Sequence, residues 1–202
     1  MALSTVAVSR RGDDDAVAVV RLNRPERLNA MSMELVDDLH RIFSGAEDSP
    51  VAGARVVVLL GNGRAFCAGA DLAANATGSG GRMWDSRIPA NQERFSSLIV
   101  KMRATPQPLI CGVQGAAGGG GMGLALAADV RIAGKSALFI PSFLAIGLSG
   151  CELGTSFFLP KMIGISNASM YLMTGESINA QEAYRMGMVS KVVDDAQVRS
   201  SL

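Results

Sequence analysis

The sequence predicts one α/β domain with largely parallel sheets, and three observations lead to this prediction. Short apolar runs rich in β-branched residues alternate along the chain with segments in which apolar residues recur at helical spacing. The chain has 202 residues, 49% of them hydrophobic, which is enough for the core of one ordinary domain. No linker and no repeat of fixed period divides it. Residues 1–202 are therefore expected to fold as a single domain.

The first predicted strand and helix lie near the N-terminus. Val17–Leu22 (VAVVRL) is rich in β-branched residues and is followed by NRPER, where Pro25 cannot continue a strand ladder. Ser32 then suits a helix N-cap. The apolar residues that follow it at helical spacing are Leu35, Leu39 and Ile42.

The middle of the chain repeats this order. Arg55–Leu60 (RVVVLL) is typical of a buried strand in a parallel sheet, and a GNGR turn closes it. Residues 75–89 are rich in glycine and poor in apolar residues, which predicts a mobile loop. A second amphipathic helix follows, and its apolar face is formed by Phe95, Leu98, Ile99 and Met102. Leu109–Val113 is the next apolar strand.

The last part of the chain contains shorter elements. Two short strands are predicted in VRIAG (130–134) and ALFI (137–140), and a third in MVSKVV (188–193). The predicted helices are Leu124–Ala128, Phe157–Ile163, Asn167–Met173 and Ala180–Met186. Strands that alternate with helices in this way indicate mostly parallel pairing.

Charge and hydropathy exclude several classes of partner. The chain has 19 Lys and Arg against 18 Asp and Glu, without a basic block or an acidic tail. Nucleic acid and anionic membranes are therefore not expected as partners. The N-terminus lacks the apolar run of a signal peptide, and no stretch approaches a membrane span. The expected protein is soluble and cytoplasmic.

The cysteines and the histidine argue against a metal site and against thiol chemistry. Cys67, Cys111 and Cys151 are odd in number, widely spaced and set among apolar or glycine residues, which favours reduced and mostly buried thiols. Cys67 is interpreted as a small packed thiol, because no histidine base lies near it in sequence. His40 lies in the first helical pattern and is expected to have no catalytic function.

A run of glycines joins a predicted strand to a predicted helix. Gly118, Gly120 and Gly123 match G-x-G-x-x-G, but no acidic residue follows about 20 positions later, as a dinucleotide site requires. A phosphate-binding loop is excluded because no Lys-Ser or Lys-Thr follows. Bare N–H groups at a helix start can instead bind a developing oxyanion. An oxyanion hole normally needs two N–H donors, so a second segment of small residues is required. Arg64–Leu72 (RAFCAGADL) offers one.

Three motifs in this order resemble the enoyl-CoA hydratase/isomerase, or crotonase, superfamily. They are RPERLNAM (24–31), AFCAGADL (65–72) and QGAAGGGGMGLALAAD (114–129). The segments GLSGCELGTSFFLPKMIG and LMTGESINAQEAYRMGMVSKVV are also similar to later parts of the family, so the resemblance covers about residues 17–193. It implies a spiral of ββα units, homotrimers or pairs of trimers, and an acyl-CoA or enoyl-CoA thioester as substrate, with no cofactor.

The resemblance also implies the site residues. The N–H groups of Ala70 and Gly120 would hold the thioester oxygen as it becomes enolate-like. Arg24 and Arg27 are candidates for the CoA phosphates, although an exposed turn with two arginines can equally be solvated surface. Asp71 is expected to cap a turn beside the substrate, and Asp129 to be structural. The remaining predicted substrate contacts are Leu28, Ala30, Ala68, Leu72, Gly119 and Phe143.

The sequence departs from the family at its acids and in its length. Gly123 and Phe143 stand where a hydratase of the family carries its two glutamates, and neither residue can transfer a proton. Glu152 lies within one residue of an acidic position used in isomerase chemistry, and the alternative is that it caps a helix beginning near Gly154. The usual C-terminal helical extension is expected to be absent, because the chain stops at RSSL.

Three functions remain open on these grounds. The leading expectation is an enzyme of fatty acid metabolism that stabilises a thioester enolate and uses Glu152 for isomerase-like proton transfer. The second is an orthodox enoyl-CoA hydratase, and the third is an acyl-CoA-binding member without catalytic activity. Assays of hydration, isomerisation and thioester binding separate them.

Overall fold

The protein is built on two sheets, which a computed structural model describes over residues 3–75 and 88–200. The large sheet contains, in spatial order, β1 (Val6–Arg11), β2 (Val17–Leu22), β3 (Val56–Gly61), β4 (Leu109–Val113), β6 (Val130–Gly134) and β9 (Lys191–Val193). The small sheet contains β5 (Ala116–Gly118), β7 (Leu138–Ile140) and β8 (Ile178–Asn179). Pairing is parallel except between β1 and β2 and between β7 and β8. The predicted α/β class with mostly parallel strands is therefore confirmed.

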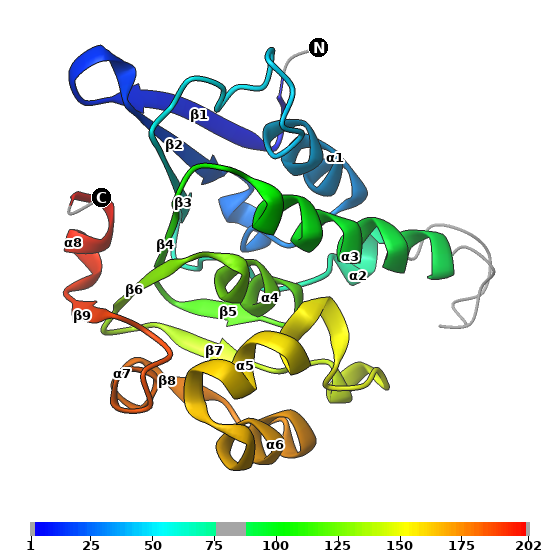
Figure 1. The fold of residues 1–202 in the computed structure, drawn as a ribbon. Coiled ribbons are helices and arrows are strands. Elements are labelled where there is room, and N and C mark those ends of the chain that lie inside the picture. The colour runs from blue at the N-terminus through cyan, green and yellow to red at the C-terminus, as the bar shows by residue number, and fades with distance from the viewer. Residues whose placement is uncertain (1–2, 76–87, 201–202) are drawn as a thin grey trace.

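Helices cover both faces of the large sheet. The α-helices are α1 (Met33–Ile42), α2 (Leu72–Asn75), α3 (Ile88–Ala104), α4 (Gly120–Ala127), α5 (Thr155–Ile163), α6 (Ile165–Thr174), α7 (Ala180–Arg185) and α8 (Asp195–Ser200). Short 3-10 turns are η1 (Asp13–Asp15), η2 (Pro25–Arg27), η3 (Leu144–Ile146) and η4 (Glu152–Gly154). Figure 1 shows α1, α3, α4 and α5 on one side of the sheet and α8 on the other. Among the described helices, none is long and apolar enough to cross a membrane.

The apolar runs of the sequence are strands that are buried on both faces. In β2, Ala18, Val20 and Leu22 point into the main core beneath α1, α3 and α4. Val19 points the other way and packs in a second cluster with Val198 of α8. A strand between two helical layers must be apolar at successive positions, which explains why VAVVRL and RVVVLL lack polar alternation.

The chain repeats a unit of two strand segments and a helix, as the family resemblance implies. β4, β5 and α4 form one such unit, and β6, β7 and α5 form the next. Two single parallel bridges extend the small sheet toward the N-terminus. Cys67 pairs with Ala117 of β5, and Ala70 pairs with Met31. The segments after β2 and β3 therefore occupy the places that β5 and β7 occupy in the later units.

Glycine lets two of these segments approach closely. A Cβ atom at Gly121 would lie 2.2 Å from the carbonyl oxygen of Cys67, and one at Gly69 would lie 2.8 Å from the carbonyl oxygen of Gly118. Each distance is shorter than any real Cβ contact. The glycine run of the sequence therefore allows backbone to pack directly against backbone at this crossing.

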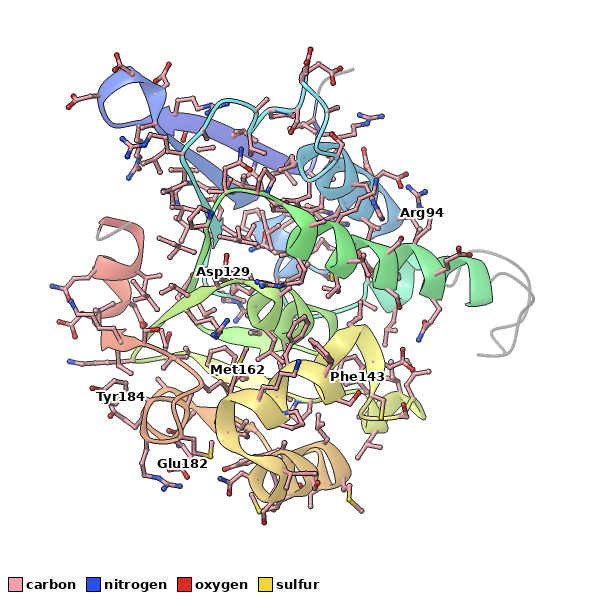
Figure 2. The ribbon with its side chains drawn as sticks, viewed as in Figure 1. Arg94, Asp129, Phe143, Met162, Glu182 and Tyr184 are labelled. Carbon is pink, nitrogen blue, oxygen red and sulfur yellow. The ribbon has the colours of Figure 1, made fainter. Side chains whose placement is uncertain are left out.

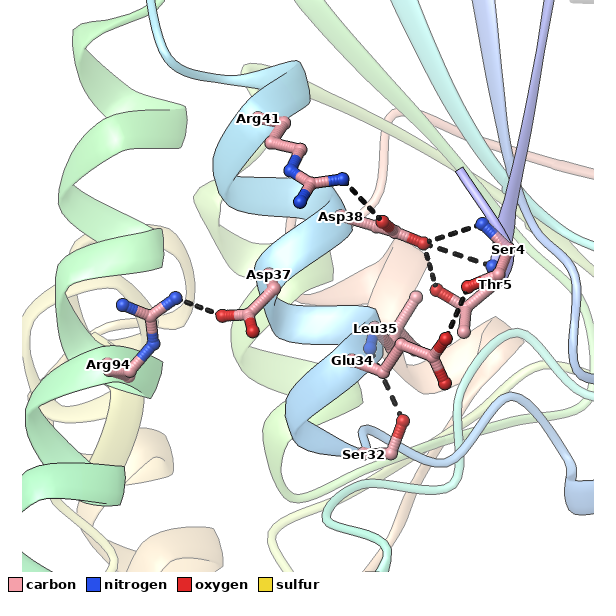
Figure 3. A network of polar contacts seen from close by, with 9 residues as sticks. All are labelled: Ser4, Thr5, Ser32, Glu34, Leu35, Asp37, Asp38, Arg41 and Arg94. Atoms are coloured by element: carbon pink, nitrogen blue, oxygen red, sulfur yellow. Dashed lines mark hydrogen bonds and ion pairs between the residues drawn. The ribbon is translucent and has the colours of Figure 1, made fainter. Parts of the chain in front are cut away.

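Polar contacts fix α1 to its neighbours. Ser32 caps the helix by accepting the N–H of Leu35, as predicted. The carboxylate of Asp38 is buried and accepts both the N–H and the hydroxyl of Thr5, while Arg94 of α3 pairs with Asp37 (Figure 3).

His40, on the same helix, is a partly buried structural residue, in agreement with the prediction. Its Nε2 lies 2.9 Å from the carbonyl oxygen of Arg94. Partial burial is the main cause that lowers the pKa of His40. The neutral ring is therefore favoured at the junction of α1 and α3.

Asp129 is structural, as predicted, and joins β4, α3 and the end of α4 (Figure 2). Its carboxylate accepts the N–H of Leu109 at 2.8 Å and pairs with Arg103 at 2.6 Å. Partial burial acts to raise the pKa of Asp129, but the hydrogen bonds from Leu109 and Arg103 outweigh it and the pKa is lowered.

Several elements differ from the prediction. The strands β1, β5 and β8 and the helices α2 and α8 were not predicted, and α4 begins at Gly120 rather than at Leu124. Helix α3 begins at Ile88, seven residues before Phe95, so Pro89 lies in its first turn, where a missing N–H costs nothing. The rest of the predicted loop, residues 76–87, lies outside the described residues.

The close backbone crossing predicts a large effect for a small substitution. Gly121→Ala should lower the free energy of unfolding by about 1–3 kcal/mol, because the new methyl group collides with the Cys67 backbone. Alanine otherwise favours a helix by roughly 1 kcal/mol over glycine, so the sign of the effect is informative. Urea unfolding followed by circular dichroism measures it. Ser169→Ala, on the exposed surface of α6, is the control and should change stability by less than about 0.5 kcal/mol; equal stability of Gly121→Ala would contradict the proposed packing.

Candidate functional site

A cavity of about 260 Å³ lies between the two backbone segments that cross at the glycines, the start of α3 and the loop around η4. Glu152 provides the one ionisable side chain among the described lining residues. The lining residues are Ala68, Ala70, Leu72, Gln92, Phe95, Ser96, Gly119, Gly120, Ser142, Phe143, Ala145, Ile146, Leu148, Glu152 and Leu153. The cavity is therefore mostly apolar, with a few polar groups, which is typical of a small-molecule site.

The backbone N–H of Ala70 points away from its neighbouring segment. Met31 donates its N–H to the carbonyl of Gly69 at 2.7 Å and accepts the N–H of Asp71 at 3.1 Å. Because N–H groups alternate in direction along an extended segment, the N–H of Ala70 lies on the opposite side from Met31. Ala70 lines the cavity.

The N–H of Gly120 is one of the free donors of a helix start. Gly119 occupies the N-cap position of α4 with φ 43° and ψ −110°, a conformation that glycine adopts without strain. Gly120 is the first helical residue, so its N–H has no partner within the helix. Across residues 3–75 and 88–200, neither this N–H nor that of Ala70 donates a hydrogen bond.

The two donors belong to segments in direct contact. A Cβ atom placed on Gly69 would lie 3.6 Å from the nitrogen of Gly120. Ala70 and Gly120 both line the cavity, as do five further residues of the predicted set, which are Ala68, Leu72, Gly119, Phe143 and Glu152. The structure thus brings together the two segments that the sequence pairs as sources of N–H donors, and α4 directs the positive end of its dipole to the same place.

The arginines of the RPERLNA segment are paired with a buried carboxylate. Asp71 is 4% exposed and contacts Arg24 at 3.0 Å and Arg27 at 3.5 Å. Arg24 also donates to the carbonyl of Ala30 at 2.5 Å. Because Asp71 directly follows Ala70, these ion pairs connect the RPERLNA segment to the loop of Ala70. The sequence did not predict this pairing. Neither arginine lines the cavity described above.

Leu28 and Asn29 tie the same segment to the loop that carries Ala70. Both adopt left-handed backbone conformations, with φ of 52° and 54°. The carbonyl of Leu28 accepts the N–H of Ala68 at 3.0 Å. The buried side-chain amide of Asn29 donates to the carbonyls of Ala65 and Phe66, both at 3.0 Å. Leu28 and Ala30 thus contribute backbone atoms that support the site rather than side chains that line it.

Glu152 lies in the cavity and does not cap α5. The N-cap of that helix is Gly154, and no side chain of the described residues caps it there. The carboxylate of Glu152 instead accepts a hydrogen bond from the side-chain amide of Gln92 in α3. The capping alternative for Glu152 is therefore wrong, and the residue lines the cavity, where its carboxylate is bound to Gln92.

The family resemblance implies that Gly123 and Phe143 stand where hydratases carry two glutamates, and the structure shows what surrounds these two residues. Phe143, which is labelled in Figure 2, is buried and lines the cavity, and a Cβ atom at Gly119 would lie 3.7 Å from its ring. A Cβ atom at Gly123 would lie 2.8 Å from the Cβ of Leu153. Leu153, in η4, therefore covers Gly123 and fills the space into which a side chain at position 123 would project.

The buried thiols have no catalytic character. Burial raises the pKa of Cys67 to about 12 and that of Cys111 to about 12, so both are protonated at neutral pH. Cys151 is exposed, and it is not among the cavity residues. The prediction that Cys67 is a packed thiol rather than a nucleophile agrees with its burial.

Sequence reasoning missed several residues of the cavity. Gln92 lies three residues before Phe95, on the face of α3 that the apolar pattern predicted, so extending that pattern by one turn would have found it. Leu153 directly follows Glu152, but an apolar side chain in a short loop gives no sequence pattern that would mark it as a cavity residue. The other lining residues not predicted are Phe95, Ser96, Ser142, Ala145, Ile146 and Leu148.

Comparisons with known proteins agree on one family. The sequence model of the family described as enoyl-CoA hydratase/isomerase matches residues 12–202. A probable enoyl-CoA hydratase of Mycobacterium bovis is 39% identical over 186 residues, which span 90% of this chain and 64% of that protein. A 1,2-epoxyphenylacetyl-CoA isomerase of Escherichia coli is 35% identical over 183 residues, or 90% and 68% of the two chains. The crystal structure of an enoyl-CoA hydratase from Bacillus anthracis has a TM-score of 0.88, with 31% identity, 98% coverage of this chain and 73% of that one.

Thiol labelling tests the burial of the cysteines around the site. A disulfide reagent at pH 8 should modify one of the three thiols in the folded protein, Cys151, and all three in denaturant. Cys67 and Cys111 should resist because they are both buried and protonated. Mass spectrometry of the labelled peptides identifies the thiol, and rapid labelling of Cys67 in the folded state would show that the glycine crossing is open.

Proposed function

The chain belongs to the enoyl-CoA hydratase/isomerase family, and we propose that it is an enzyme that binds an acyl-CoA or enoyl-CoA thioester and stabilises its enolate. The observation that carries the proposal is the pair of unpartnered N–H groups of Ala70 and Gly120 at one cavity. Two fixed donors in a mostly apolar site stabilise the negative charge that develops on a thioester oxygen. The proposed reaction uses no cofactor, and the CoA thioester is its substrate.

Glu152 is the proposed acid and base. In a 3-enoyl thioester, its carboxylate takes a proton from C2, and the electron pair of that C–H bond moves through the carbonyl to give a dienolate oxygen held by the two N–H groups. Glu152 then returns the proton to C4, which leaves a 2-enoyl thioester. The atoms and charges balance without another reactant, and isomerisation is thus the reaction that a single carboxylate can complete.

The RPERLNA segment is the proposed contact for the CoA portion of the substrate. Asp71 pairs with both Arg24 and Arg27, and the side chain of Arg27 is half-exposed. Glu26 of the same segment balances the second arginine, so the feature that favours phosphate is the exposed guanidinium group of Arg27, which can donate to phosphate oxygens. Asp71 would orient the arginines while Leu28 and Ala30 hold their loop against the segment of Ala70.

Hydration by a pair of glutamates is the weaker candidate, although relatives are named as hydratases. Gly123 and Phe143 cannot activate water, and Leu153 fills the space at Gly123. A binding protein without catalysis remains the third candidate.

We further propose assembly as a homotrimer or a pair of trimers, as the family resemblance implies. Exposed apolar side chains on α5 and α6 are consistent with such contacts, since Phe157 of α5 is 59% exposed and Ile165 and Met173 of α6 are 76% and 77% exposed. Light scattering measures the mass of the assembly.

Substitution of the proposed base tests the reaction. Glu152→Gln should lower the rate of 3-enoyl-CoA isomerisation by about 10²–10⁴-fold, because the amide cannot accept the proton. Binding of a saturated acyl-CoA should change little, which calorimetry measures. Rapid crotonyl-CoA hydration that Glu152→Gln leaves unaffected would overturn the isomerase proposal in favour of the hydratase. Thioester binding with neither reaction would favour the binding protein.

Backbone substitution tests the two N–H donors. A side chain at position 120 would press against Met31, with a Cβ atom 2.8 Å from its sulfur, so proline there would disturb the fold. Replacing Ala70 by lactic acid exchanges the N–H for an ester oxygen without added bulk. The turnover should fall by roughly 10²–10³-fold, the usual cost of one oxyanion donor. The same exchange at the exposed residue Ala73 is the control, and equal rates for the two ester variants would refute the assignment.

A further inference from the structure

We propose that Gln92 is a positioning residue that holds the carboxylate of Glu152 in its reactive orientation. This inference rests on the proposed function of Glu152 as acid and base. Its basis is the hydrogen bond from the side-chain amide of Gln92 to Oε2 of Glu152, at a cavity that both residues line. The bond joins α3 to η4 across a sequence separation of 60 residues.

The backbone of Glu152 is fixed independently of Gln92. Leu153, with φ 53°, covers Gly123 on one side. Thr155 is fully buried, and its hydroxyl lies 2.6 Å from the carbonyl oxygen of Gly150 and 2.8 Å from that of Glu152. Gly154 packs against α3, since a Cβ atom there would lie 3.6 Å from Ile99. These contacts hold the main chain of η4 at the cavity wall.

The side chain of Glu152 has three rotatable bonds beyond this fixed backbone. Within the described residues, its carboxylate has one hydrogen-bond partner, the amide of Gln92. A glutamate without that partner can exchange among several staggered rotamers, and most of them move the carboxylate by more than an ångström. Gln92 therefore selects one rotamer among those that the backbone allows.

The hydrogen bond also gives the two carboxylate oxygens of Glu152 different roles. Gln92 donates to Oε2, so Oε1 is left to accept the substrate proton. The donor is a neutral amide that neither gives up nor takes a proton at ordinary pH. Gln92 thus orients the base and takes no part in the proton transfer itself. Misplacing a reacting group by about 1 Å can cost on the order of a hundredfold in rate.

A double-mutant cycle tests this inference. Gln92→Leu keeps the approximate volume of the side chain and removes the donor, and it should lower kcat for isomerisation by roughly tenfold or more with little change in KM. In the Glu152→Gln background, Gln92→Leu should cause no further loss of kcat beyond about twofold, because nothing remains to be oriented. Equal losses in both backgrounds would overturn the inference and indicate a structural effect of Gln92.

Two further measurements separate the possible failures. Glu93→Leu introduces the same side chain at the next position of α3, which is exposed and does not line the cavity, so kcat should stay unchanged. Thermal unfolding should show that both leucine variants are folded at the assay temperature. A normal rate for Glu152→Gln alone would overturn the proposed function together with this inference, whereas a large loss for Glu152→Gln with none for Gln92→Leu would overturn this inference alone.

Discussion

The direct contact of two backbone segments, 67–70 and 118–121, is the constraint on which the rest of the structure depends. Carbonyl oxygens of each segment lie where side chains of the other would begin, so glycine is required at Gly69, Gly118 and Gly121. The contact brings Cys67 into register with β5 and thereby extends the small sheet beyond its regular strands. It also leaves two N–H donors at one cavity. The glycine run matches a nucleotide-binding fingerprint, but its role in the structure is to let two backbone segments pack together.

Five of the six strands of the large sheet could be predicted from their apolar, β-branched sequences, whereas β1 was missed. β2, β3 and β4 are apolar at successive positions, as buried parallel strands must be. β5 could not be predicted, because Ala116–Gly118 has no β-branched residue and forms a strand through its pairing with β7 and Cys67. Its strand character is set by tertiary contact rather than by propensity. The start of α4 was misplaced for the same reason, since consecutive glycines disfavour a helix in isolation and α4 is completely buried.

The candidate site divides in a similar way. Ala70, Gly120 and Phe143 could be placed in one cavity because they lie in or near short motifs that resemble the family, and the resemblance implies their positions in the site. The pairing of Asp71 with Arg24, and that of Gln92 with Glu152, joins residues 47 and 60 positions apart. Such pairs depend on how α3, η2 and η4 pack, and polar residues give no periodic signal for that packing. Short sequence motifs therefore identify the N–H donors of the site better than they identify the residue that binds Glu152, the proposed acid and base.

The leucine that covers Gly123 restricts which side chain can stand at that position. Leu153 and a side chain at position 123 would occupy the same volume, since their Cβ atoms would be 2.8 Å apart. A carboxylate introduced at position 123 would first have to displace the turn that presents Glu152. A larger side chain at position 123 is therefore expected to require a smaller one at position 153. The turn that carries Glu152, the proposed base, thus also limits which side chains position 123 can accept.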